Sequence, residues 1–292
     1  MHYLLLYVAF MVTFSQGLRY AQRRGAGVVP VSAANYVAAA TLCAAVLLVC
    51  WSGQPADGRR AAWMLGATNG ATYVGSLIFM LAGYRLVGIG ITLAFTQIGV
   101  TVPVLVSFLF WGEAMSPFQW AALALLPAAV VLMRPPTAGR GKLTLAGDAV
   151  LVGAMLTAGT AGTIHKAFRV WGPKAAGLGP FADGSLIYLA ALFAVAAVLT
   201  VAYVRFRRLR YGGRIVAMGT GLGVINILAS LFILLALAAL PAAEVFPVSS
   251  SAVIGLSVLL GRILWKERVS ARQAIGVVVA IAVVVLANVK AG

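Results

Sequence analysis

Ten long apolar runs divide this chain from end to end, and they constrain its fold more than any other feature. Each has roughly 20 residues, the length that an α-helix needs to cross about 30 Å of hydrocarbon. Only 10% of the residues are charged, whereas a soluble domain has about 25%. Loops between the runs are mostly short and leave no room for a soluble domain. The sequence therefore predicts an all-α membrane protein with ten transmembrane helices.

The expected helices cover residues 2–22, 30–52, 61–84, 87–111, 117–134, 146–168, 181–204, 214–240, 241–265 and 270–289. The first run has no basic residue before it and no convincing cleavage site after it, so we expect a retained helix rather than a signal peptide.

The pattern W-x-E-x-x-S-x-x-Q occurs twice, with its two copies 154 residues apart. With the same shift and no gap, residues 76–132 match residues 230–286 at 15 of 57 positions, where chance gives about five in so apolar a chain. The spacing predicts two five-helix repeats, 1–134 and 146–292, joined by a linker at 135–145. Because five is odd, the second repeat enters the membrane from the opposite face. Such inverted repeats are typical of transporters that work by alternating access.

Each copy of the pattern has the features of a helix start. Ser116 precedes an apolar run, Pro117 takes the first helical position, and Gln119 follows the serine by three residues. This spacing predicts a capping box, in which serine and glutamine satisfy free backbone N–H groups. Ser270 and Gln273 repeat it.

The two glutamates of the pattern, Glu113 and Glu267, stand just before these helix starts. The positive end of a helix dipole favours a carboxylate there. We expect a tight structural loop in each copy, and a role in gating or proton coupling is the alternative.

Ten helices in a five-plus-five duplication, with W-x-E-x-x-S-x-x-Q after helices four and nine, resemble the EamA-type branch of the drug/metabolite transporter superfamily. The resemblance spans the whole chain. It implies a central cavity lined mainly by helices one, three, four, six, eight and nine. It also implies export or exchange of small metabolites, including amino acids, with relatives that carry nucleotide sugars, triose phosphates or cationic drugs.

Polar side chains inside hydrocarbon are costly and are therefore candidates for substrate binding. The candidates are Gln16, Arg19, Asn69, Tyr73, Gln97, His165, Asn226, Glu244 and Ser250. Asn69 and Tyr73 are four residues apart, so they share one helix face. Each candidate also has a structural alternative: a serine bonds to its own helix, His165 marks a helix end, and Arg19 reaches the membrane interface.

Acidic residues narrow the substrate class. Glu244 stands in a nearly chargeless region, where it either pairs with a substrate amine, carries a proton or marks a helix N-terminus. The first helix lacks the carboxylate that the small drug-efflux relatives place there, and Gln16 is its nearest polar substitute. This pattern favours a zwitterionic or neutral polar solute.

We therefore expect a secondary transporter of a small polar metabolite, working as an exporter or exchanger. Efflux of cationic compounds and exchange of phosphorylated metabolites or nucleotide sugars are the alternatives within transport. A membrane-embedded enzyme is the non-transport alternative. It is not expected, because the chain has six acidic residues, two histidines and no paired spacing for metal or acid–base chemistry. Neither a cofactor nor a bound metal is expected, and the partners are a small-molecule substrate and membrane lipid, with the chain as a monomer or homodimer.

The formal charge of +16 is carried by short loops, where it indicates membrane orientation and anionic headgroups rather than nucleic acid. Alternate loops carry 6 and 16 basic residues. The positive-inside rule puts the richer side in the cytoplasm and both termini outside, whereas the family resemblance implies cytoplasmic termini. The expected location is a bacterial inner (plasma) membrane.

Overall fold

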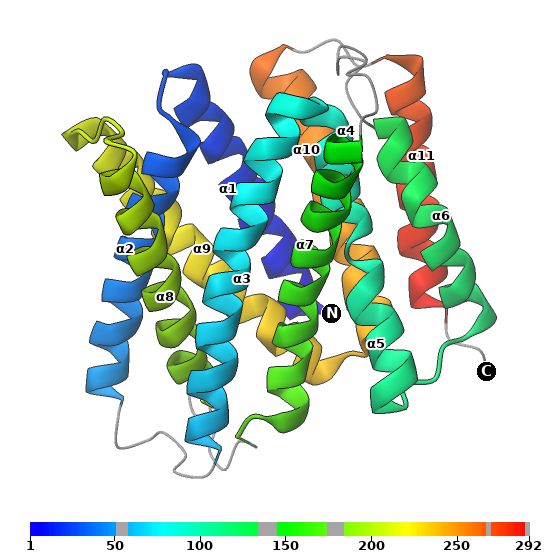
Figure 1. Ribbon diagram of the computed structural model, residues 1–292. Coiled ribbons are helices and arrows are strands. Elements are labelled where there is room, and N and C mark those ends of the chain that lie inside the picture. Colours follow the sequence, from blue (N-terminus) through cyan, green and yellow to red (C-terminus); the bar gives the residue numbers. More distant parts are fainter. Residues whose placement is uncertain (51–57, 134–144, 174–183, 267–269, 290–292) are drawn as a thin grey trace. The chain divides into compact units, whose positions relative to one another are not determined.

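The computed structural model contains the whole chain, and we describe residues 1–50, 58–133, 145–173, 184–266 and 270–289. In this part of the chain all regular structure is helical (Figure 1). The helices are α1 (His2–Arg23), α2 (Val28–Val49), α3 (Arg59–Leu86), α4 (Ile89–Ile98), α5 (Thr101–Trp111), α6 (Pro117–Met133), α7 (Leu145–Trp171), α8 (Ser185–Phe206), α9 (Gly213–Ala239), α10 (Ala242–Trp265) and α11 (Ala271–Asn288).

Eight of the described helices are long and apolar enough to cross a membrane. They are α1, α2, α3, α7, α8, α9, α10 and α11, and the apolar α5 and α6 are shorter. The chain is therefore an integral membrane protein of the all-α class. The expected linker lies almost wholly outside the described residues, which resume at Leu145.

One expected helix, 87–111, is interrupted and forms α4 and α5. Pro103 lacks the N–H that would bond to the carbonyl of Gly99, and the Val102 N–H bonds to that carbonyl instead, at 3.0 Å. Gly99 also faces the backbone carbonyl of Met155 on α7, so a side chain there would collide with it. The proline and this close backbone contact together account for the break.

Contacts between Cα atoms divide the described residues into two compact units. The first unit contains Met1–Val74 and Ile164–Ala239, and the second contains the described parts of Gly75–Thr163 and Leu240–Gly292. Helices α3 and α7 each contribute residues to both units.

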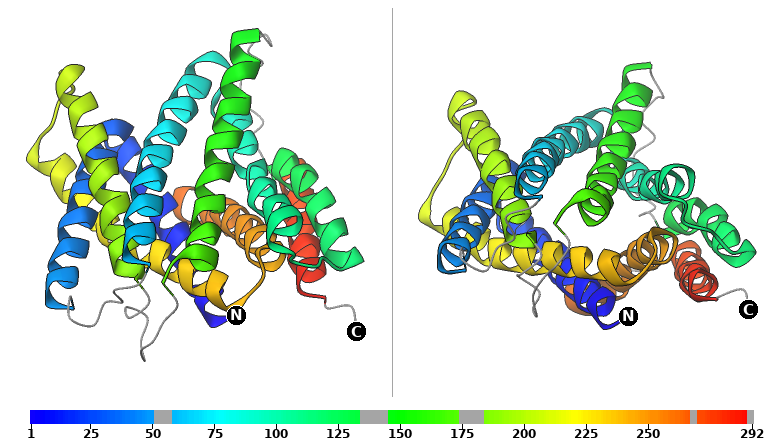
Figure 2. Two further views of the ribbon diagram at one scale, coloured as in Figure 1. Left: turned by 60° about the horizontal axis from the view of Figure 1, so that its bottom comes forward. Right: turned by 90° about the horizontal axis from the view of Figure 1, so that it is seen from below.

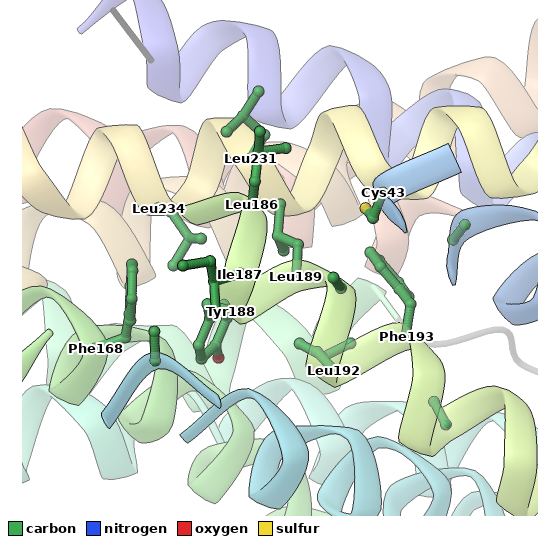
Figure 3. Packing of buried hydrophobic residues seen from close by; sticks show 14 of the residues in the cluster. Cys43, Phe168, Leu186, Ile187, Tyr188, Leu189, Leu192, Phe193, Leu231 and Leu234 are labelled. Carbon is green, nitrogen blue, oxygen red and sulfur yellow. The ribbon is translucent and has the colours of Figure 1, made fainter. Parts of the chain in front are cut away.

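In the first unit, α2 packs against α8 and α9, and α9 packs against α1 (Figure 2). Its core is formed largely by α8, whose Tyr188, Leu189 and Phe193 are fully buried (Figure 3). The Tyr188 ring stacks on Phe168 of α7, with ring centroids 4.5 Å apart. Apolar burial of this kind holds α8 close to its neighbours.

Glycines on α3 allow α8 to approach very closely. Gly66 faces the backbone carbonyl of Tyr188, and Gly70 faces that of Leu192. A Cβ atom at either glycine would collide with backbone, so only glycine fits. From the first contact to the second, the residue number rises by four on α3 and by four on α8, so the two helices run in the same direction.

The same arrangement joins α9 to α2 in the first unit. Gly219 faces the carbonyl of Val31, and Gly223 faces that of Asn35. The α9 glycines follow the α3 glycines by 153 residues, and the carbonyls on α8 follow those on α2 by 157 residues. Each glycine contact on α3 therefore has a counterpart on α9.

In the second unit, α6 and α11 both begin with the predicted capping box. The Ser116 oxygen accepts from the Gln119 N–H at 3.2 Å, and the Gln119 side chain accepts from the Ser116 N–H at 3.0 Å. The corresponding distances at Ser270 and Gln273 are 3.3 and 3.0 Å. The prediction from the sequence is confirmed at both helices.

The two glutamines also bond across to each other's helix. Gln119 donates to the carbonyl of Ala287 at 3.5 Å, and Gln273 donates to that of Met133 at 3.4 Å. Each glutamine starts one helix and reaches the end of the other, so α6 and α11 are antiparallel. Donors and acceptors are both related by a shift of 154 residues.

The second residue of the motif has a left-handed backbone in both copies. Gly112 caps α5 with φ 66°, and Lys266 caps α10 with φ 53°. This conformation suits glycine at a helix C-terminus and costs other residues about 1 kcal/mol. The two copies thus differ at a position where the backbone favours glycine.

Candidate functional site

A chain of hydrogen bonds joins three helices inside the first unit. His165 of α7 stands between two tyrosine hydroxyls, with Tyr188 3.0 Å from Nδ1 and Tyr73 3.1 Å from Nε2. The Asn69 amide nitrogen donates to the Tyr188 hydroxyl at 2.5 Å. Three of the predicted site residues, Asn69, Tyr73 and His165, are therefore brought together, and Tyr188 links them.

These bonds have a preferred direction. Because the Asn69 amide nitrogen only donates, the Tyr188 oxygen accepts from it and its O–H is free to donate to His165 Nδ1. In a neutral imidazole the other nitrogen, Nε2, then carries the proton and donates to Tyr73. With the proton on Nδ1 instead, the Tyr188 O–H would have no acceptor among these side chains.

Close packing of the helices brings these hydrogen-bonded side chains together. Asn69 lies between Gly66 and Gly70, the glycines that admit α8, so a short amide reaches the Tyr188 hydroxyl. Asn69 and Tyr188 are fully buried and His165 is 5% exposed. Tyr73 is only half-buried, which makes it the most accessible member of the chain.

A second polar pair in the first unit joins α9 to α2. The predicted residue Asn226 donates from its amide to Asn35 at 3.3 Å, and both side chains are buried. The pair lies beside the contact between Gly223 and Asn35. Each amide therefore has a side-chain partner within the apolar interior.

In the second unit, two further predicted residues contact each other near the break between α4 and α5. Ser250 of α10 donates to the Gln97 side-chain oxygen at 3.1 Å. Gln97 stands two residues before Gly99, at the end of α4. The bond ties the interrupted segment to α10.

Two carboxylates lie at the N-terminus of α10. Glu244 is in its first turn and is 5% exposed. Glu113, from the connection between α5 and α6, accepts from the Ala242 N–H at 2.7 Å. The sequence indicated only that Glu113 precedes the start of its own following helix, and its bond to α10 was not expected. Its counterpart Glu267 lies outside the described residues.

Gln16 and Arg19, the remaining predicted residues, are half-buried on α1 in the first unit. Sequence reasoning missed Tyr188, which stands in the apolar run SLIYLAALF. The only available signal was the hydroxyl itself, because a buried tyrosine usually finds a hydrogen-bond partner. Among the residues that the structure describes, no three or more His, Cys, Asp or Glu side chains are grouped to hold a metal ion.

No family model and no curated protein matches the chain. Among solved structures, 28 chains match. One of them, described as "Crystal structure of protein", superposes with a TM-score of 0.77 over 98% of this chain and 95% of its own. The two sequences are 16% identical, so this likeness shows the fold alone.

Proposed function

We propose that the chain is a secondary transporter of the EamA type, in the drug/metabolite transporter superfamily, that moves a small polar metabolite by alternating access. In this proposal α4 and α5 form one interrupted span, which brings the number of membrane spans to ten. Two inverted repeats of five spans then follow each other along the chain, in a bacterial plasma membrane.

The reciprocal bonds between α6 and α11 carry this proposal. Gln119 and Gln273 exchange equivalent bonds with the ends of each other's helix, 154 residues apart, and the two helices are antiparallel. Antiparallel helices with exchanged equivalent contacts are what a two-fold axis between inverted repeats produces. Inverted repeats favour transport, because exchange of their conformations opens a site to either face.

The counterpart glycine contacts of the first unit give independent support. Gly66 and Gly70 on α3 use the same pattern toward α8 as Gly219 and Gly223 use toward α2. A solved structure shares the fold over nearly the whole chain.

Within this proposal, Tyr73 contacts the substrate, and His165, Tyr188 and Asn69 position its hydroxyl. Tyr73 is the half-buried end of the chain, whereas the other three are buried. A fixed hydroxyl suits a hydrogen-bonding group of the solute, such as a carboxylate or carbonyl. In the second unit, the Gln97–Ser250 pair is likewise polar and uncharged. A neutral or zwitterionic solute such as an amino acid fits such groups.

Glu244 favours a second candidate, efflux of cationic compounds. A carboxylate that is 5% exposed is costly to bury, and a cationic substrate would compensate its charge. Transport assays separate the two candidates.

The test is uptake by proteoliposomes loaded with amino acids, measured as counterflow for each amino acid and for a lipophilic cation. We expect flux of at least one amino acid, reduced at least about tenfold by Tyr73→Phe through loss of a buried hydrogen bond. Tyr203→Phe, on an exposed part of α8, is the matched control and leaves flux unchanged. Cation flux without any amino-acid flux would establish the second candidate, and flux of neither would reject the proposed transport.

A further inference from the structure

The connection between α8 and α9 is the most basic exposed surface of the described chain. Residues 205–214 read RFRRLRYGGR, and all ten are exposed. Five are arginines and none is acidic, so no charge within the segment neutralises them. We call residues 205–214 the arginine segment.

The arginine segment lies at a membrane surface. It connects α8 and α9, each long and apolar enough to span a bilayer. Phe206 is 82% exposed and Tyr211 is 46% exposed, and aromatic side chains of this kind prefer the headgroup region. The opposite charges available at that depth are the phosphates of phospholipids.

A wide-open surface cavity of about 570 Å³ lies where the arginine segment leads into α9. It is lined by Arg210, Tyr211, Gly212, Gly213, Arg214 and Ile215. The residues Arg210, Tyr211 and Arg214 therefore border one open space at the surface. All three are hydrogen-bond donors suited to phosphate oxygens.

The backbone of the cavity adds donors of the same kind. The first hydrogen bond of α9 runs from the Val216 N–H to the Gly212 carbonyl, at 3.0 Å. The N–H groups of Gly213, Arg214 and Ile215 precede it and remain outside the helical ladder. A Cβ atom at Gly212 or Gly213 would meet nothing within 4 Å, so the space beside these amides is open.

At the end of α8, an arginine occupies a position where the backbone conformation favours glycine. Arg208 has a left-handed backbone with φ 48°. The Leu209 N–H closes the helix on the Val204 carbonyl at 3.0 Å, in the arrangement that usually places glycine at this position.

From the cavity, its donors and its place at the membrane, we propose that the arginine segment binds the phosphate of an anionic phospholipid. Arg210, Arg214, Tyr211 and the first amides of α9 hold the phosphate oxygens. Arg205 and Arg207, which do not line the cavity, contribute only general attraction. This site is separate from the proposed substrate site and does not depend on transport.

The test compares lipid binding to purified full-length protein in detergent, using native mass spectrometry and thermal stabilisation. Phosphatidylglycerol and phosphatidylcholine are the two lipid probes, and inorganic phosphate is the water-soluble probe. The variant Arg210→Gln/Arg214→Gln removes two cavity charges. The matched control Arg205→Gln/Arg207→Gln removes two charges from the same segment outside the cavity.

We expect wild type and control to bind phosphatidylglycerol in preference to phosphatidylcholine, and the cavity variant to bind it about tenfold or more weakly. Equal weakening in both variants, or equal binding of both lipids, would overturn the proposal. Displacement of phosphatidylglycerol by millimolar inorganic phosphate would identify a free phosphate site and would also overturn it. All four substituted residues are exposed, and a single symmetric peak in size-exclusion chromatography confirms that both variants fold.

Discussion

Two corresponding places in the first unit are filled by different side chains. In one, His165, Tyr188 and Asn69 form the buried hydrogen-bonded chain between α7, α8 and α3. In the other, between α1, α2 and α9, a buried apolar cluster packs in addition to the Asn35–Asn226 pair. That cluster consists of Ala21, Val31 and Leu222.

The correspondence follows from shifts already seen elsewhere in the chain. Asn69 and Leu222 are 153 residues apart, as are the glycines of α3 and α9. Tyr188 and Val31 are 157 residues apart, as are the carbonyls that those glycines face. His165 and Ala21 are 144 residues apart. The same shift relates the sequence Met155-x-Thr157 to Met11-x-Thr13.

The difference shows whether the packing of the helices requires the polar side chains. One helix framework is closed by small and aliphatic side chains in one place and by asparagine, histidine and tyrosine in the other. Apolar side chains are the cheaper filling, because buried polar groups must all find partners. The histidine and the tyrosine are therefore not needed at these positions to pack the helices, which favours the role in transport proposed for them.

The strongest test of the shared framework substitutes its glycines. Gly66→Ala and Gly219→Ala should each lower the free energy of unfolding by about 3 kcal/mol, because the added methyl meets backbone on α8 or α2. Thermal unfolding in detergent measures the loss. Gly221→Ala is the control on the same helix as Gly219, since nothing lies within 4 Å of its Cβ. A large effect at only one of the first two positions would break the correspondence.

The polar filling itself is tested by Tyr188→Phe. The change removes one oxygen and leaves the Asn69 amide and His165 Nδ1 without their partner, at a cost of about 2 kcal/mol. Loss of stability is followed by thermal unfolding, with Tyr203→Phe on the exposed part of α8 as control. An unchanged unfolding temperature would mean that the chain of bonds contributes nothing to the native state.

The reciprocal glutamines test the correspondence in the second unit. Gln119→Leu and Gln273→Leu each remove a capping bond and one bond between helices, so each should cost about 1.5 kcal/mol. The two changes lie at opposite ends of an antiparallel pair, and their effects should add in the double variant. Unequal single effects would show that the two ends are not equivalent.

The smallest expected effects on stability come from the second residue of the motif, which differs between the two copies. Gly112→Ala should lower the free energy of unfolding by about 1 kcal/mol, since alanine is strained at φ 66°. Lys266→Gly should raise it by about 0.5 kcal/mol by relieving the same strain at φ 53°. Unfolding temperatures of both variants decide the matter, and a loss of stability on Lys266→Gly would show that the lysine side chain contributes more than its backbone costs.

Much of the fold was predictable because membrane spans leave a strong pattern of apolar length. The described helices begin and end within a few residues of the expected ones, and the capping boxes followed from serine and glutamine spacing. The break at Gly99 was missed although Pro103 signalled it, because an apolar run hides a lost hydrogen bond. The bond between Glu113 and α10 was not expected, since sequence shows neighbours along the chain and not across it.

The candidate site was predictable only in part. Asn69 and Tyr73 share one helix face, so their association could be expected from a spacing of four. Their link to His165 passes through Tyr188, and it depends on how closely α8 approaches α3 at Gly66. Contacts between helices far apart in sequence leave no local pattern, and Tyr188 is indistinguishable in sequence from an ordinary core tyrosine.

The hydrogen bonds between α6 and α11 do not depend on an unbroken peptide chain between the two halves of the sequence. Every bond in this pair joins one half of the sequence to the other, from Gln119 to Ala287 and from Gln273 to Met133. The peptide between the halves is not part of any of them. A chain severed between residues 134 and 144 would keep these bonds as contacts between two polypeptides. The two fragments, expressed together, are therefore suited to complementation, with each half serving as the other's folding partner.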